Sequence, residues 1–246
     1  TSTFLQAQQD AQFSQYMFNQ LFLNPAVAGL DQENIELGLI HRSQWAGYSA
    51  TFDDGSAPVT QVFRMSAPIR VANSGIGLHL VRDQLGPLTN LELMLSYAYH
   101  HKLQNGNVLS LGIRGGIYNQ TIDFSKYRFN DANDPLIPSE NKENQIKPDF
   151  NLGLYYSSEK FFVGASLNHL VKAEFNYGTG ININSLDKNF TFLGGVNFDV
   201  SPTFTIAPSA ILKTDFNTAS YEVSTIFTYD EKYFLGGSLR ASNSLD

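Results

Sequence analysis

The chain has 246 residues, of which 23 are acidic, 16 are basic and none is cysteine. The lack of cysteine excludes disulfides, thiol chemistry and cysteine-based zinc sites, and the acidic balance argues against nucleic acid as a partner, because phosphates bind basic surfaces. No long unbroken apolar run occurs, so the sequence predicts no transmembrane helix. A membrane-spanning β-barrel is still compatible with the composition, since barrel strands need only alternate apolar residues and 13% of the residues are aromatic.

The N-terminal part divides into two segments. Residues 1–7 (TSTFLQA) end in a small residue, and we interpret them as the remnant of a secretory signal peptide, with a short irregular terminus as the alternative. Residues 8–33 are rich in aromatic and amide side chains. The apolar spacing around Tyr16 and Leu21 predicts one face of a short helix, and Pro25 keeps Asn24 out of helical geometry.

From residue 34 onward, apolar and polar residues alternate, which predicts strand after strand. Each run has its apolar side chains on one face, and no segment has a convincing helical pattern. Eleven strands are expected, at residues 35–40, 63–67, 76–80, 91–100, 109–114, 150–157, 161–168, 190–197, 204–210, 221–228 and 233–240.

The polar face of these strands distinguishes a barrel in lipid from a soluble sandwich. A sandwich would carry many charges on its water-facing side, whereas here that face is mostly Gly, Ser, Thr and Asn, which suit the inside of a closed barrel. Its few charged members, Glu36, Arg64, Glu92 and Arg114, are expected to face the lumen and form a charge network. A cation on the lipid face would cost roughly 2–4 kcal/mol.

Connection lengths support the same architecture, because outer-membrane barrels have short periplasmic turns and longer outer loops. The short connections are expected at 104–107, 157–160, 199–203 and 230–232, and the long ones at 124–147, 173–188 and 213–219. Earlier connections alternate less regularly, with 48–57 and 83–90 assigned to the outside and 68–74 to the periplasm. Since bacterial barrels have an even number of strands, we expect the barrel at 34–246 to be C-terminally truncated.

The opening string is more specific than any strand. The run QDAQFSQYMFN followed by NPAVAG closely resembles the N-terminal signature of the PorP/SprF family of type IX secretion system membrane proteins. Shorter strings agree with it: HRSQW at 41–45, GIGL at 75–78 followed by DQLG at 83–86, and FLGGSLR at 234–240. The family usually has a proline where Gln20 stands and an aromatic residue where Val27 stands.

The resemblance implies an all-β, transmembrane, antiparallel up-and-down β-barrel of about fourteen strands in the outer membrane of Bacteroidota. Family members support secretion and surface attachment of adhesins, in some cases with gliding machinery, or link to the periplasmic complex. The implied partners are outer-membrane lipid, other type IX secretion components and a cognate secreted adhesin. No cofactor, metal or reaction is implied, so no enzyme is expected.

Two other functions fit a barrel of this kind. A diffusion porin or hydrophobic-solute channel has the same strand pattern, whereas an outer-membrane hydrolase needs a clustered Ser/His/Asp rim that the sequence lacks. His100 and His101 are adjacent and point to opposite faces of a strand, so they cannot chelate one metal together. Trp45 is expected in an interfacial aromatic belt.

The opening string would lie before the first strand, at the periplasmic mouth of the barrel. We therefore predict that residues 8–33 form a periplasmic segment that either plugs the lumen or presents a docking surface for a partner. The side chains expected to do this are Phe13, Tyr16, Met17, Phe18, Phe22, Asn24 and Pro25.

Overall fold

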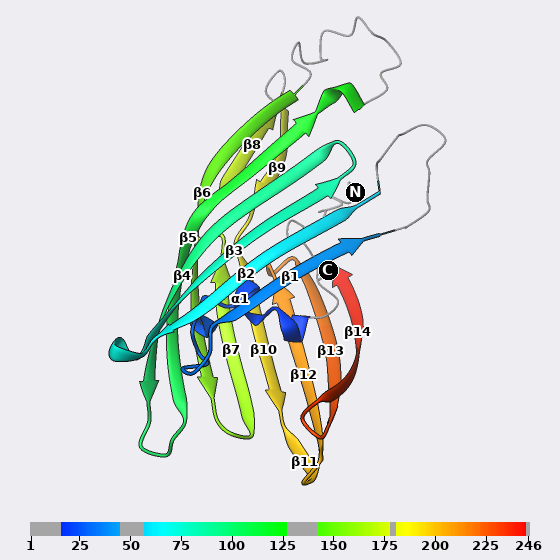
Figure 1. Cartoon of the computed structure of the whole chain (residues 1–246). Coiled ribbons are helices and arrows are strands. Elements are labelled where there is room, and N and C mark those ends of the chain that lie inside the picture. The colour runs from blue at the N-terminus through cyan, green and yellow to red at the C-terminus, as the bar shows by residue number, and fades with distance from the viewer. Residues whose placement is uncertain (1–15, 45–56, 127–141, 178–180, 245–246) are drawn as a thin grey trace, which may run out of the picture.

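A computed structural model describes residues 16–44, 57–126, 142–177 and 181–244 of the chain (Figure 1). Phe13, Trp45 and most of the expected loop at 124–147 lie outside the described residues. Within those residues, no helix is both long enough and apolar enough to cross a membrane.

One antiparallel sheet dominates the structure and forms the barrel wall. Each strand pairs with the next along the chain, except where a hairpin leaves the wall between β7 and β10. The strands are β1 (Glu36–Ser43), β2 (Val59–Ile69), β3 (Ser74–Leu85), β4 (Leu88–Lys102), β5 (Val108–Asp123), β6 (Lys142–Ser157), β7 (Phe161–Asn168), β10 (Asn189–Val196), β12 (Phe204–Thr214), β13 (Thr218–Tyr229) and β14 (Tyr233–Ser244), with β11 (Phe198–Ser201) paired to β12.

The sheet curls so that its strands surround a central space (Figure 1). This confirms the predicted all-β, up-and-down antiparallel barrel, and all eleven expected strands occur in the predicted order. The ladder path begins at β1 and ends at β14, and among the described residues no ladder joins these two strands.

The burial pattern along the wall is that of a membrane barrel. On β4, Leu93 and Leu95 are exposed, whereas Glu92, Ser96 and His100 on the opposite face are buried. A soluble sheet would bury the leucines and expose the polar side chains. The inverted pattern places apolar side chains toward lipid and polar ones toward the lumen.

This pattern becomes mixed at the end of the wall that carries the turn between β3 and β4. Arg82, Gln61 and Asn119 face outward there, and the guanidinium of Arg82 donates to the side chain of Gln61 at 3.5 Å. The inward residues there are buried and include the apolar Tyr118 and Ile122 as well as the polar Asp83 and Gln120. The outward polar side chains indicate that this end of the strands projects beyond the hydrocarbon layer into water, because such side chains are favourable on the outer face only there.

The expected long loop at 173–188 is wrong. Those residues form a hairpin of β8 (Ala173–Tyr177) and β9 (Ile181–Leu186), which pairs only with itself. Phe175 and Tyr177 of this hairpin are buried against Tyr118 and Ile122 of β5. The polar residues in the sequence suggested a loop, but on β8 the polar Glu174 and Asn176 are exposed while Phe175 and Tyr177 cover the wall.

Two other connections are shorter than expected. Gly86 and Pro87 alone join β3 to β4, with Gly86 at a φ of +58°, and residues 215–217 alone join β12 to β13. The polar residues assigned to these outer loops remain in the ladder because the strands continue into water. The alternation of short and long connections is therefore less regular than the sequence suggested.

The N-terminal segment lies inside the wall, not beyond it (Figure 1). It forms three single turns: a 3-10 turn at Tyr16–Phe18, α1 (Gln20–Leu23) and a second 3-10 turn at Pro25–Val27. The expected single helical face does not form over the described residues, because Asn19, at φ −130° and ψ 41°, separates the first turn from α1. The extended Asn24 then ends α1, and Pro25 starts a new turn. The segment leaves the lumen through Gly29, at a φ of +62°.

Candidate functional site

The most developed site in the described structure is the seat of this N-terminal segment. We call residues 16–30 the inner segment. Its side chains contribute to the main core cluster, in which Tyr16, Phe22 and Leu23 pack with Val62 of β2 and Ile211 of β12. The segment thus contacts walls on opposite sides of the lumen.

Asn24 is the central polar anchor of the inner segment and is fully buried. Its amide nitrogen donates to the carbonyl of Leu154 on β6 at 2.9 Å and to that of Ala165 on β7 at 3.2 Å. Its amide oxygen accepts from the backbone nitrogen of Ala26 at 2.9 Å and so caps the second 3-10 turn. Both ends of one side-chain amide are thus used, one to join the segment to two strands and one to hold its own turn.

Wall side chains hydrogen bond to the backbone of the segment between Leu21 and Leu23. The guanidinium of Arg114 donates to the carbonyl of Phe22 at 2.8 Å and also to that of Leu21. The hydroxyl of Ser166 donates to the carbonyl of Leu23 at 2.7 Å. These carbonyls belong to a very short helix and lie in a buried place, where an unpaired polar group is costly.

The end of the segment next to β1 is held in the same way. The Nε2 of His100 lies 2.9 Å from the carbonyl of Ala28, and its Nδ1 lies 2.7 Å from the hydroxyl of Ser110. The backbone nitrogen of Gly29 donates to the hydroxyl of Ser66 at 2.7 Å. His100 is buried and His101 is exposed, so the two adjacent histidines face opposite sides of β4.

Glycines in the wall make room for the segment. A Cβ atom at Gly112 would lie 2.2 Å from the backbone nitrogen of Ala26, and one at Gly153 would lie 2.1 Å from the side-chain oxygen of Asn24. A Cβ at Gly75 would lie 2.2 Å from the carbonyl oxygen of Ala28. Any side chain at these positions would overlap the segment, so the wall and the segment fit as a matched pair.

The aromatic residues of the segment lie in different surroundings. The hydroxyl of Tyr16 lies 2.9 Å from those of Ser209 and Ser224 on β12 and β13. Phe18 is 39% exposed, with its ring centroid 5.6 Å from that of Phe234. The remaining residues of the predicted set are Met17, which is partly buried, Phe22 and Pro25, which are buried, and Phe13, which lies outside the described residues.

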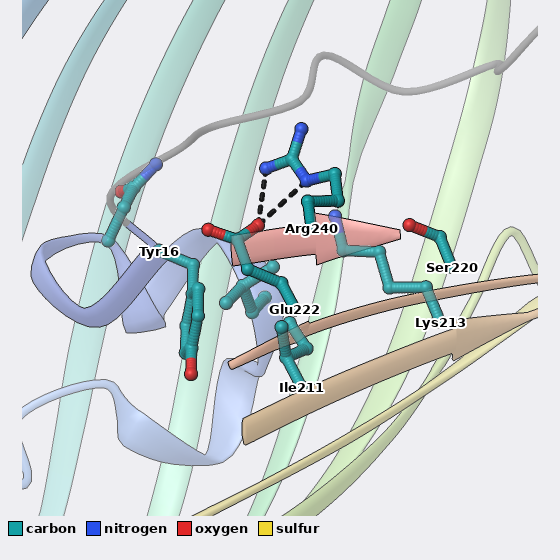
Figure 2. A pocket seen from close by; sticks show the side chains of 8 residues that line it. Tyr16, Ile211, Lys213, Ser220, Glu222 and Arg240 are labelled. Atoms are coloured by element: carbon teal, nitrogen blue, oxygen red, sulfur yellow. Dashed lines mark hydrogen bonds and ion pairs between the residues drawn. The ribbon is translucent and has the colours of Figure 1, made fainter. Parts of the chain in front are cut away.

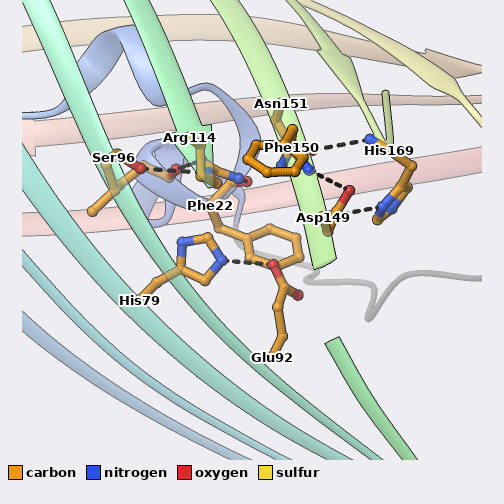
Figure 3. Close-up of polar contacts among 10 residues, drawn as sticks. Phe22, His79, Glu92, Ser96, Arg114, Asp149, Phe150, Asn151 and His169 are labelled. Carbon is orange, nitrogen blue, oxygen red and sulfur yellow. Dashed lines mark hydrogen bonds and ion pairs between the residues drawn. The ribbon is translucent and has the colours of Figure 1, made fainter. Parts of the chain in front are cut away.

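The four expected lumen charges all lie on strands of the wall. Arg64 pairs with Glu36 at 3.3 Å, and Glu92 pairs with His79 at 2.7 Å. Arg114 instead holds the inner segment and contacts the hydroxyl of Ser96 at 3.2 Å. Figure 3 shows the last two groups near Phe22, whose ring lies edge-on to His79.

Sequence reasoning missed two further ion pairs, one of them fully buried. His169 lies 2.9 Å from Asp149, as Figure 3 shows. Glu222 pairs with Arg240 at 2.5 Å beside Tyr16 (Figure 2). Arg240 and Glu222 face each other across β13 and β14, so strand pairing would have found that pair, whereas His169 follows the end of β7 and has no such signal.

The cavities left around the segment are small. The one shown in Figure 2 has a volume of about 20 Å³ and is lined by Tyr16, Asn19 and Glu222 among others. This is the space of roughly one or two water molecules. Both polar side-chain atoms of Asn19 are buried, and the described part of the chain provides no hydrogen-bond partner for them. Among the described residues, no group of three or more metal-ligating side chains occurs.

The site therefore holds a segment of the chain itself, bound by hydrogen bonds and close packing. A family model described as the type IX secretion system membrane protein PorP/SprF matches residues 5–246. This match confirms the resemblance seen in the opening string and extends it over nearly the whole chain. No curated protein matches the chain.

Proposed function

The chain belongs to the PorP/SprF family of type IX secretion system membrane proteins, and on that premise we propose that it is a docking barrel for a secreted adhesin, with its lumen closed by the inner segment. It is a β-barrel component of this secretion system in the outer membrane. The docking role and the adhesin partner are the parts that we add.

The observation that carries the proposal is the placement of the inner segment. It spans the lumen from Ser66 of β2 to Ser224 of β13 and is hydrogen bonded to both strands. A diffusion porin needs a water-filled passage, and here wall glycines and hydrogen bonds hold protein in that passage. The seat thus supports a partner-docking role over the alternative of a porin or hydrophobic-solute channel.

The predicted partner residues then divide into two groups. We assign the filling of the lumen to the buried Tyr16, Phe22, Asn24 and Pro25. We assign contact with the adhesin to Phe18, which is partly exposed. A partner could contact the exposed ring of Phe18 while the inner segment stays bound in the lumen.

A deletion strain tests the proposed role. Loss of the gene should abolish surface display of the cognate adhesin, and restoring the wild-type gene should recover it. A Phe18→Ala variant should reach the membrane normally but restore display only in part. Normal display in the deletion strain would contradict the docking role.

Planar-bilayer recording separates the proposal from the porin alternative. With the inner segment seated, the purified full-length protein should show no steady open conductance. A large, steady conductance of the wild-type protein would favour a diffusion channel instead.

A further inference from the structure

The inner segment is held almost entirely by contacts that do not depend on its covalent link to β1. Its partners are side chains and backbone groups of the wall, from Ser66 on β2 to Ser224 on β13. Its own secondary structure is limited to single turns, with α1 only four residues long. Turns this short are not stable alone, so the wall imposes the conformation.

We propose that the lumen is a peptide-binding site that reads the sequence Asn-Pro-small-x-small-Gly, and that it binds such a peptide whether or not the peptide is joined to the barrel. The occupant seen in the structure is the chain's own copy of that sequence, Asn24–Gly29.

The first half of the motif is read by hydrogen bonds and by backbone geometry. Asn24 is required because its nitrogen bridges two carbonyls on neighbouring strands while its oxygen caps the following turn. Pro25 suits the first position of that turn, where its missing N–H is not needed. The Pro25 ring lies over Gly153, where a Cβ would come within 2.9 Å of it.

The second half is read by the space available. Ala26 and Ala28 are completely buried, and a Cβ at Gly77 would lie 3.3 Å from the Cβ of Ala28. Gly29 combines a left-handed φ of +62° with the backbone carbonyl of Ala67, which lies 2.6 Å from where a Cβ would be. Larger residues do not fit at these three positions.

Val27 is less restricted than its neighbours in the motif, although it packs against the main core cluster. Its side chain is only partly buried, unlike those of the alanines on either side. The site therefore discriminates at five positions and tolerates change at the sixth. Such a pattern is what a recognition site for an extended peptide requires: hydrogen bonds for affinity, and pockets of defined size for specificity.

The linker after the segment gives a place to cut the chain. Residues 33–35 are exposed, between the segment and β1. The guanidinium of Arg70 donates to the carbonyls of Gln32 at 2.8 Å and Glu33 at 2.6 Å, so it holds the linker just before that point. While the chain is intact, the segment is present at a high effective concentration, of the order of mM. Cutting the linker should make occupancy depend on free peptide.

The test uses the full chain with a protease site inserted between Asn34 and Ile35. The folded protein is cleaved in detergent, and a fluorescent peptide of residues 16–31 is added in excess at temperatures up to just below the unfolding transition. Fluorescence anisotropy should show the labelled peptide replacing the cleaved segment. Failure to exchange under these conditions would overturn the proposal, because the segment would then be an inseparable part of the fold.

Unlabelled competitor peptides test the reading of the motif without altering the barrel. An Asn24→Ala peptide loses three hydrogen bonds and should compete roughly 10–100-fold more weakly, and an Ala28→Leu peptide should not compete measurably. A Val27→Thr peptide is the matched control and should stay within a few-fold of the native one. Equal competition by the Asn24→Ala and Val27→Thr peptides would refute recognition of the motif.

Discussion

Replacing Asn24 in the intact chain gives the sharpest check on how the inner segment is held. Asn24→Ala removes two hydrogen bonds to the wall and the cap on Ala26. At about 1 kcal/mol for each bond, the seated state should lose roughly 3 kcal/mol. Asn24→Asp keeps nearly the same volume but should cost more, since a carboxylate would face the carbonyls of Leu154 and Ala165 without a proton to donate.

The assay is the rate at which chymotrypsin cleaves within the inner segment. Residues 16–30 contain no Lys or Arg but several aromatic and leucine sites, which are protected while the segment is seated. When opening is fast compared with cleavage, the rate follows the open population, so a loss of about 3 kcal/mol corresponds to roughly 100-fold faster cleavage for Asn24→Ala. Asn24→Asp should be cleaved faster still.

The matched control is Asn197→Ala, because Asn197 is exposed between β10 and β11. This substitution should change the cleavage rate by less than about threefold, as expected for a surface site. If Asn24→Asp were cleaved no faster than Asn24→Ala, the geometry assigned to this side chain would be wrong. If both behaved like Asn197→Ala, the segment would not be held by Asn24 at all.

Three further outcomes are expected. Gly153→Val places atoms where Asn24 and Pro25 lie, so the segment should become sensitive to chymotrypsin, whereas Gly237→Val, with open space around it, should not change. Gly112→Ala places a Cβ atom 2.2 Å from the backbone nitrogen of Ala26 and should also make the segment sensitive to chymotrypsin; protection equal to that of the wild type would contradict the close approach of the segment to β5. Leu95→Arg on the lipid face should lower folding stability in bilayers by roughly 2–4 kcal/mol, measured by urea unfolding, and Leu95→Met should not.

The wall was largely predictable because a membrane barrel repeats one simple rule. Alternation of apolar and polar residues identified all eleven strands of the ladder in order. The small polar residues on the face opposite the apolar ones indicated that this face lines a barrel lumen and is not the water-exposed face of a soluble sandwich. The ends of the strands were not predictable in this way. Toward the β3–β4 turn the alternation becomes mixed, so the strand residues at 83–85 and 88–90 were assigned to a loop.

The hairpin β8–β9 escaped prediction for a related reason. Its sequence alternates as well, with Ala173, Phe175 and Tyr177 on one face, but its strands are short and flanked by polar residues. What makes it a structured element is the apolar surface of Tyr118 and Ile122 on β5, which is distant in the sequence. Local pattern carries no information about that contact.

The sequence by itself determined the family, the barrel and the importance of the opening string, because these depend on local periodicity and on an unbroken run of residues. Only the tertiary structure decided what the string does. Asn24 holds the segment by hydrogen bonds to two carbonyls on β6 and β7. Ala28 is held by His100 and is limited in size by Gly75 and Gly77. These partners are distant along the chain, and they converge on the segment only because the curl of the sheet turns the inner faces of its strands toward one axis.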